Sequence, residues 1–223
     1  ELLKKDGLDV IPIDEITGNP RDSFDGRMKT ISFQIESGIL FDRKKPSHIE
    51  EAKKLNIPQI DIVVCNLYPF EEKPGIETID VGGPTMIRAA AKNYQNVLVV
   101  VDPAEYEMIS KALDDGKVDN GLRQKLAAKA FYHLSLVDCL IADFLSKEQF
   151  PKEFTIPVRK SKDLRYGENP HQRGAFYLVP KTNSPLANLD HLWGRKLSGT
   201  NIGDMYAGIE TVRQFDEAAA CVI

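Results

Sequence analysis

The sequence predicts an α/β fold with a mostly parallel sheet, followed by the start of a second α/β unit. Two short apolar runs rich in β-branched residues, Ile60–Val64 and Val97–Val101, are typical of strands buried on both faces of a parallel sheet. The strong helix former Thr85–Lys92 lies between them, so strands and helices alternate. Beyond the polar, proline-interrupted stretch Lys147–Lys162, which is the predicted linker, the pattern begins again.

Caps and periodicity indicate the remaining elements. Ser47 and Glu50 form a capping box that predicts a helix over Ser47–Leu55. Asp102 and Pro103 predict the opening of a helix over Ala104–Asp115. The other expected elements are a long helix with an apolar stripe over Leu122–Leu145, a strand over Gly174–Val179 and a helix over Met205–Phe215.

The two ends of the chain predict an internal fragment. Glu1–Lys5 resembles the last turn of a helix with Gly7 as its C-cap, and Val10–Ile13 resembles a strand. Ala218–Ile223 is an apolar run of the kind that leads into a loop, where α/β proteins place their chemistry. We therefore expect flanking sequence on both sides.

Composition excludes several classes of protein. The chain has 223 residues with 29 basic and 33 acidic side chains, whereas a protein that binds duplex nucleic acid usually carries a basic excess. No apolar run reaches the length of a membrane helix, and no signal peptide is visible. The scattered Cys65, Cys139 and Cys221 predict reduced thiols in a cytoplasmic protein and no zinc site.

Two segments near predicted strand ends combine turn residues with polar groups. In Asp25–Thr30, the side chains of Arg27, Lys29 and Thr30 follow a turn glycine and suit an anion, although a solvated basic turn explains them equally well. Asn66–Phe70 directly follows the strand Ile60–Val64, where ligands gather in open parallel sheets. The alternative for this second segment is a packed loop plug.

A third segment, Asp80–Lys92, places a glycine pair before a helix. Gly82 and Gly83 allow close backbone approach, and the helix start offers free N–H groups to an anion. Asp80 could accept or deliver a proton, and Arg88 and Lys92 lie one turn apart. A capped surface helix with solvated cations is the structural alternative.

A fourth segment, Leu164–Gln172, crowds Arg165, Tyr166, Asn169 and His171 into one loop. Arginine suits a phosphate or carboxylate, and tyrosine and histidine suit a heteroaromatic ring. A single loop histidine is usually only solvated, but four such groups together favour a binding loop.

These segments, in this order, resemble the bifunctional purine-biosynthesis family, AICAR transformylase/IMP cyclohydrolase. The resemblance covers nearly the whole chain. Its motifs are T-G-x-P at Thr17–Pro20, D-G-R-x-K-T at Asp25–Thr30, V-V-C-N-L-Y-P-F at Val63–Phe70, I-D-V-G-G-P-T-M-I-R-A-A-A-K-N at Ile79–Asn93, V-V-V-D-P at Val99–Pro103 and L-R-Y-G-E-N-P-H-Q at Leu164–Gln172.

The resemblance implies a fold and a pair of reactions. Residues 1–157 would form a methylglyoxal-synthase-like doubly wound parallel sheet that closes FAICAR to IMP with loss of water. Residues 158–223 would begin a cytidine-deaminase-like domain that transfers a formyl group from 10-formyltetrahydrofolate to AICAR. Ring closure would need neither a metal nor another cofactor, and the protein would be a cytoplasmic homodimer.

The same resemblance assigns roles to residues. In the cyclohydrolase, Lys29 would contact the phosphate or the reacting end, Tyr68 would donate a proton, Asp80 would act as base and Lys92 would stabilise the oxyanion. The residues expected to bind substrate are Arg27, Thr30, Asn66, Gly82, Gly83, Thr85, Arg165, Tyr166, His171 and Asn201.

The chain departs from the family pattern in three places. Ser32 and Glu36 stand where the family has histidines. The family's first strand with its S-T-G-G-T phosphate loop would precede Glu1, and its Lys-His pair would follow Ile223. We therefore expect the chain alone to show neither activity well.

Two other functions fit the same residues. The lost histidines favour a non-catalytic nucleotide-sensing domain on the same scaffold. A different phosphate-ester lyase on this sheet would have no use for the loop Leu164–Gln172, so transformylase activity would exclude it.

Overall fold

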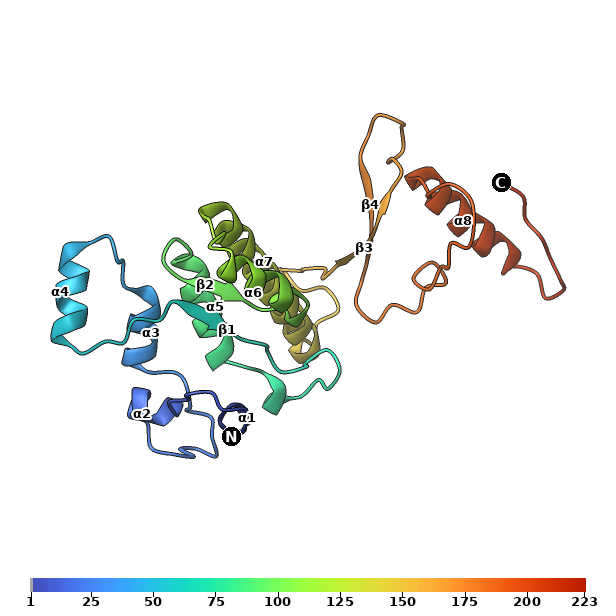
Figure 1. Cartoon of the computed structure of the whole chain (residues 1–223). Coiled ribbons are helices and arrows are strands. Elements are labelled where there is room, and N and C mark those ends of the chain that lie inside the picture. Colours follow the sequence, from blue (N-terminus) through green and yellow to red (C-terminus); the bar gives the residue numbers. More distant parts are fainter. Residues whose placement is uncertain (1) are drawn as a thin grey trace. The chain divides into compact units, whose positions relative to one another are not determined.

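The computed structural model describes residues 2–223, which divide between Lys147 and Glu148 into two compact units (Figure 1). The helices and strands of the first unit are α1 (Leu2–Lys5), α2 (Ile13–Thr17), α3 (Phe33–Leu40), α4 (Pro46–Lys54), β1 (Ile62–Val64), η1 (Ile76–Thr78), α5 (Gly82–Lys92), β2 (Leu98–Val100), η2 (Pro103–Glu105), α6 (Tyr106–Asp114) and α7 (Asn120–Leu145). Those of the second unit are β3 (Arg159–Leu164), β4 (Gly174–Leu178) and α8 (Gly199–Val212). No helix within residues 2–223 is long and apolar enough to cross a membrane.

The first unit is built on the parallel pair β1 and β2. Ile62 lies opposite Leu98 and Val64 lies opposite Val100, and α5 connects the two strands. Helices α5 and α7 pack against this pair and against each other (Figure 1). The prediction of an α/β fold with a parallel sheet is therefore confirmed at this level.

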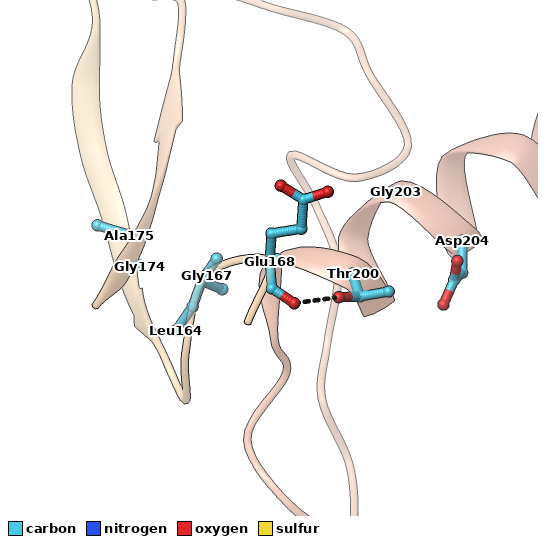
Figure 2. A pocket seen from close by; sticks show the side chains of 9 residues that line it. Leu164, Gly167, Glu168, Gly174, Ala175, Thr200, Gly203 and Asp204 are labelled. Atoms are coloured by element: carbon cyan, nitrogen blue, oxygen red, sulfur yellow. Dashed lines mark hydrogen bonds between the residues drawn. The ribbon is translucent and has the colours of Figure 1, made fainter. Parts of the chain in front are cut away.

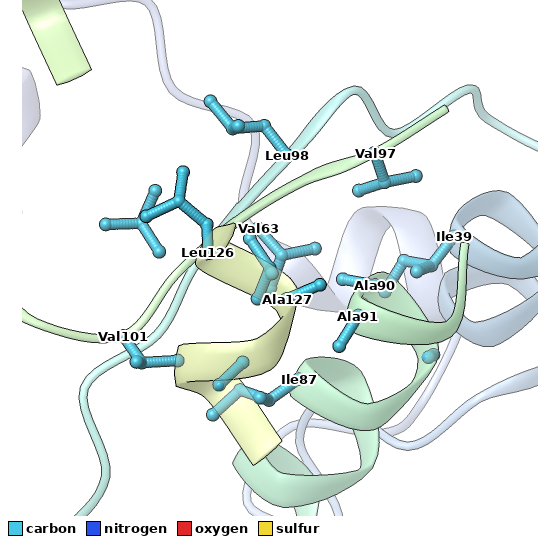
Figure 3. Packing of buried hydrophobic residues seen from close by; sticks show 14 of the residues in the cluster. Ile39, Val63, Ile87, Ala90, Ala91, Val97, Leu98, Val101, Leu126 and Ala127 are labelled. Carbon is cyan, nitrogen blue, oxygen red and sulfur yellow. The ribbon is translucent and has the colours of Figure 1, made fainter. Parts of the chain in front are cut away.

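The core lies where the two strands meet α3, α5 and α7. Figure 3 shows Val63 of β1 and Ile87 of α5 among side chains of β2 and α7. The run Val97–Val101 is buried throughout, as predicted. The same prediction is wrong for β1, because Ile62 and Val64 are 40% and 56% exposed. Within the described residues β1 pairs only with β2 and is therefore an edge strand, and the face that carries these two side chains is exposed.

One arginine joins the starts of both strands. Arg43 Nη1 donates to Asp61 Oδ1 at 2.7 Å and to the carbonyl of Asn96 at 2.9 Å. Its Nη2 donates to the carbonyl of Ile60. Asp61 precedes β1 and Asn96 precedes β2, so a single guanidinium with several donors fixes the separation of the strands at this end.

Most predicted helices of the first unit are confirmed, with shifted starts. The stripe on α7 is buried at Leu126, Ala130 and Leu134, but its predicted last residue, Leu145, is 53% exposed. Residues 103–105 form η2 before α6 begins at Tyr106. The capping box predicted for α4 is wrong. The helix begins at Pro46, one residue before the predicted start at Ser47, and its N-cap is Lys45, whose side chain makes no capping hydrogen bond. Proline at this position is pre-organised for a helix start, which explains the difference.

At the start of the chain, one prediction is confirmed and one is wrong. Gly7 ends α1 with a φ of +80° and donates to the carbonyl of Lys4 at 3.1 Å, whereas Glu1 lies outside the described residues. The strand predicted over Val10–Ile13 is absent from the described fold, and α2 begins at Ile13 instead. Pro12 has no N–H to donate to a ladder and serves as the N-cap of α2.

The second unit contains an antiparallel hairpin and one longer helix. Arg159 of β3 lies opposite Leu178 of β4, which confirms the strand predicted near Gly174–Val179. Strand β3 begins inside the predicted linker, of which residues 147–158 carry no helix or strand. Helix α8 begins at Gly199 rather than at the predicted Met205. The earlier start follows from a capping box in which Ser198 and Asn201 each accept from the other's backbone N–H.

Helix α3 contains the explanation for one of the two residues that replace family histidines. Ser32 is its N-cap, and its Oγ accepts from the N–H of Ile35 at 3.1 Å. Glu36 lies in the first turn, where a helix favours negative charge. However, its Oε1 is buried and has no hydrogen-bond partner among the described residues. Burial raises the pKa of the Glu36 carboxyl above its usual range.

We predict that Glu36→Gln stabilises the protein at neutral pH. Because the folded pKa of Glu36 is raised, the native state loses stability as the pH rises through that pKa, and glutamine removes this loss. The expected gain in the free energy of unfolding at pH 7.5 is at most about 1 kcal/mol, since the side chain is only partly buried.

Urea unfolding at pH 7.5 and at pH 4 measures this effect. The gain from Glu36→Gln should shrink toward pH 4, and Glu50→Gln, at an exposed position of α4, is the matched control. An equal gain at both pH values would show that the charge of Glu36 is not what destabilises the native state.

Candidate functional site

Three segments that are distant in the sequence meet at the start of α5. Asp80 lies just before the helix, and its Oδ1 accepts from the N–H of Gly83 at 2.9 Å. Thr30 approaches Gly82, and Leu67, two residues beyond Cys65 at the end of β1, approaches Gly83. The structure thus brings together parts of the first, second and third predicted segments.

The glycine pair is required here for space. Neither Gly82 nor Gly83 has a positive φ. A Cβ on Gly82 would lie 2.4 Å from Thr30 Oγ1, and a Cβ on Gly83 would lie 2.7 Å from Asp80 Oδ2 and 2.9 Å from Leu67 Cδ2. Contacts this short are not tolerated, so any side chain at either position would displace the polar groups of the site.

The electrostatics support the same grouping. Cys65 is half-buried, and its pKa is raised first by burial and then by the negative charge of Asp80. The thiol therefore stays protonated at neutral pH. The carboxylate of Asp80 is half-buried and held by a helix N–H, so it presents a fixed oxygen at the helix start.

A second contact lies at the ends of the two strands. Asn66 follows β1, and its Oδ1 accepts a hydrogen bond from the Tyr106 hydroxyl at 2.7 Å. Tyr106 is the first residue of α6 and follows β2 through η2. The carboxyl ends of both strands are thus joined at the edge where open parallel sheets bind ligands.

The cations of the first segment are arranged differently. Arg27 Nη2 donates to Glu77 Oε1 of η1 at 2.5 Å, and both side chains are largely exposed. The side chain of Lys29 lies over Gly26, where a Cβ would meet its Cε at 2.7 Å. Gly26 has a φ of +84°, so this turn also needs glycine for its backbone.

Other predicted residues of the first unit do not join this group. Lys92 is exposed at the last position of α5, about 15 Å along the helix axis from Gly82. Thr85 donates its hydroxyl to the carbonyl of Val81 at 2.8 Å, a contact within the helix start. Tyr68 is 54% exposed and follows Leu67 by one residue.

In the second unit, the predicted loop is anchored to the start of α8. The N–H of Gly199 donates to the carbonyls of Tyr166 at 2.9 Å and Gly167 at 3.0 Å, and the N–H of Arg165 donates to Leu197 O at 2.7 Å. The guanidinium of Arg165 lies 4.8 Å from the centroid of the Tyr166 ring. These contacts hold the loop against the helix start.

The two remaining predicted residues of this unit have different environments. His171 is exposed at the tip of the loop. Asn201 uses its side-chain oxygen to accept from the N–H of Ser198 at 3.1 Å, so it caps α8. Ser198 is completely buried. The sequence pattern S-x-x-N at 198–201 is close to a capping box and would have located this helix start.

Figure 2 shows a hollow of about 520 Å³ beside this loop. Its lining includes Gly167 and Glu168 of the loop, Gly174 of β4 and Thr200 and Asp204 of α8. The Thr200 hydroxyl donates to the carbonyl of Glu168 at 3.3 Å. Glycines line much of the hollow, so backbone groups are accessible from it.

No group of three or more His, Cys, Asp or Glu side chains that could hold a metal occurs within residues 2–223.

The contacts of Tyr106, Lys129 and Asp102, which support the strand ends, are not predicted from the sequence. Lys129 Nζ of α7 donates to Asp102 Oδ2 at 2.6 Å. The one signal in the sequence for the Lys129–Asp102 contact is that Asp102 directly follows a predicted strand.

We predict that Asp80→Asn makes Cys65 more reactive toward iodoacetamide. Removing the carboxylate charge lowers the pKa of the Cys65 thiol, so more thiolate is present at a given pH and alkylation becomes severalfold faster at pH 8. Burial remains, so the rate should stay below that of an exposed thiol.

Mass spectrometry of the Cys65 peptide across pH 7–10 gives the rate profile. Exposed Cys221 is the internal control, and its profile should not change. Identical Cys65 profiles in both proteins would mean that the Asp80 charge does not act on this thiol, and the grouping of the segments would be wrong.

Comparison with known proteins identifies the family to which the chain belongs. The family model described as "AICARFT/IMPCHase bienzyme" matches residues 90–223, more than half of the chain. The "Bifunctional purine biosynthesis protein PurH" of Leuconostoc citreum (strain KM20) is 42% identical over an alignment of 233 residues, gaps included, that covers 100% of this chain and 46% of the relative. The protein of the same name from Bacillus mycoides (strain KBAB4) is 43% identical over an alignment of 237 residues, which again covers 100% of this chain and 46% of the relative.

Among solved structures, "Crystal structure of ForH" is similar, with a TM-score of 0.58 and 33% sequence identity. The match covers 64% of this chain and 78% of that chain. This chain spans about half of the length of the two PurH relatives. The family model and the full coverage of this chain by the relatives show that it belongs to the AICARFT/IMPCHase bienzyme family.

Proposed function

We propose that this protein acts in the synthesis of IMP, by formyl transfer to AICAR and dehydrative ring closure of FAICAR. The observation that carries the proposal is the meeting of Thr30, Asp80 and the segment after β1 at the glycine pair of α5. This grouping offers a carboxylate, a hydroxyl and a helix start within one small region, as a phosphorylated, proton-exchanging substrate requires.

Ring closure needs positioning and proton transfer. The carboxamide nitrogen of FAICAR attacks the formyl carbon, a C–N bond forms, and the formyl oxygen leaves as water. Asp80 would accept the proton of the carboxamide nitrogen, since its other oxygen is already held by Gly83 N–H. Tyr68 would protonate the oxyanion formed on the formyl carbon, and Asp80 would return the proton it accepted to the same oxygen, which leaves as water. The formamide nitrogen would lose its own proton as the C=N bond forms, and this proton restores Tyr68. Holding the two reacting groups together is worth several kcal/mol of the barrier.

The cations and hydroxyl of the first segment would bind the substrate phosphate. Thr30 lies at Gly82, so a phosphate there would also meet the N–H groups at the start of α5. Lys29 would approach from the adjacent turn, and Arg27 would exchange Glu77 for the phosphate. Asn66 would contact the base, and Gly82, Gly83 and Thr85 would form the wall of this site.

Lys92 has the role of oxyanion stabiliser by resemblance alone, because it lies at the other end of α5. In formyl transfer, Arg165, Tyr166, His171 and Asn201 would form part of the AICAR site, and 10-formyltetrahydrofolate would be the co-substrate that supplies the formyl group. The contacts between the Arg165–Tyr166 loop and α8 would give that site a fixed backbone.

The remaining expectations complete the proposal. Residues 1–157 would be the cyclohydrolase domain with a methylglyoxal-synthase-like sheet, and residues 158–223 would begin a cytidine-deaminase-like transformylase domain. The protein would be a cytoplasmic homodimer. Its ligands would be the purine precursors AICAR, FAICAR and IMP rather than nucleic acid or a membrane.

We predict that Asp80→Asn lowers kcat for FAICAR cyclisation by about 10²- to 10⁴-fold in the protein at its full natural length, because the base is lost. KM should change much less, and formyl transfer to AICAR should persist. The absorbance of IMP reports FAICAR cyclisation. The control is Asp143→Asn, at an exposed position of α7, which should leave kcat unchanged.

Three outcomes would contradict the proposal in different ways. IMP binding without turnover by the wild-type protein would indicate a nucleotide-sensing protein. A wild-type protein that does not transfer a formyl group to AICAR would indicate another reaction on this scaffold. An unchanged kcat in Asp80→Asn would remove Asp80 from the mechanism.

A further inference from the structure

Tyr106 makes a contact that the proposed reaction does not use directly. Its hydroxyl donates to Asn66 Oδ1 at 2.7 Å, across the carboxyl ends of β1 and β2. Both side chains lie at the surface, so the contact faces a region that a ligand can reach. Forty residues separate the two, and the contact therefore depends on the fold.

The position of Tyr106 is itself fixed by a chain of contacts. Asp102 Oδ2 accepts from Lys129 Nζ at 2.6 Å, and its Oδ1 accepts from the N–H of Ala104 at 3.0 Å. Lys129 also lies 3.1 Å from Glu105 Oε2. These bonds hold η2, which leads directly into Tyr106. The hydrogen bond from Lys129, with that of the Ala104 N–H, keeps the pKa of Asp102 below its usual range.

The contact determines which way the Asn66 amide is turned. A side-chain amide has one acceptor oxygen and two N–H donors on opposite branches. Because the Tyr106 hydroxyl donates to Oδ1, the oxygen branch is directed to Tyr106. No contact of Nδ2 is seen within residues 2–223, so both donors remain for a ligand.

We propose that Tyr106 is a positioning residue that makes Asn66 a hydrogen-bond donor to the purine precursor. The group recognised is an acceptor, namely the carboxamide oxygen of the open-chain substrate or the corresponding ring oxygen of IMP. A fixed amide avoids the loss of orientational freedom on binding and excludes groups that could only donate at this position. The inference rests on the proposed function and deepens it.

The test uses IMP binding and FAICAR cyclisation by the protein at its full natural length. Tyr106→Phe removes only the hydroxyl, so IMP should bind about 3- to 10-fold more weakly, and KM should rise by a similar factor while kcat changes less than about twofold. Tyr132→Phe, at a side chain 79% exposed on α7, is the matched control and should change neither constant.

A second variant separates positioning from general stability. Asn66→Asp keeps an acceptor for Tyr106 but removes both N–H donors, so it should weaken IMP binding at least as much as Tyr106→Phe does. In the Asn66→Asp protein, adding Tyr106→Phe should cause no further loss of affinity. A purely structural role of Tyr106 would instead give the same loss in both backgrounds.

The outcomes separate the two proposals. If the wild-type protein binds IMP and Tyr106→Phe binds it equally well, only this inference is overturned. If the wild-type protein does not bind IMP, the proposed function fails and this inference fails with it. If Tyr106→Phe lowers the unfolding temperature, Asn66→Asp decides, and wild-type affinity in that variant overturns the inference.

Discussion

The close packing around Gly82 and Gly83 is the constraint on which the site depends. An added Cβ at Gly82 would meet Thr30 Oγ1 at 2.4 Å, and one at Gly83 would meet Asp80 Oδ2 at 2.7 Å. The absence of two side chains therefore lets a hydroxyl and a carboxylate reach the start of α5. The two glycines thus give these polar groups access to the helix start.

The rest of the first unit supports that position. The buried strand β2 and helix α7 hold α5 through the core, where Ile87 is completely buried. Arg43 fixes one end of the strand pair, and the contacts of Lys129, Asp102 and Tyr106 fix the other. Apolar burial thus sets the helix, and hydrogen bonds at the strand ends place the polar groups.

Much of the fold could be predicted because periodicity reports burial. The apolar run Val97–Val101 and the first half of the stripe on α7 are predictable from spacing, because both are buried by neighbouring elements in the way that their patterns indicate. The exact starts of helices are harder to predict, because residues near Pro46 and Ser198 are also typical of helix starts. The exposure of Ile62 and Val64 could not be predicted, since it depends on what lies beside β1.

The site was predictable only in part. The segment Asp80–Lys92 and the segment that ends at Thr30 each combine residues that suit anions or proton transfer, and the structure groups Asp80, Thr30 and the glycine pair, whose roles remain predictions. Lys92 shares that motif but lies at the far end of the same helix, because eleven helical residues extend too far for one cluster. Tyr106 was missed because its partner is distant in sequence and no local pattern marks a tertiary hydrogen bond.

The most direct test of the account is the affinity of Gly82→Ala for IMP, measured by calorimetry on the protein at its full natural length. The added Cβ must push Thr30 aside, so the unfolding temperature should fall modestly, while the displacement of Thr30 should weaken IMP binding by about tenfold or more. Gly121→Ala is the control, because its Cβ would meet only Asp119 at an ordinary 3.4 Å. Unchanged IMP affinity in Gly82→Ala would contradict the claim that space at this glycine builds the site.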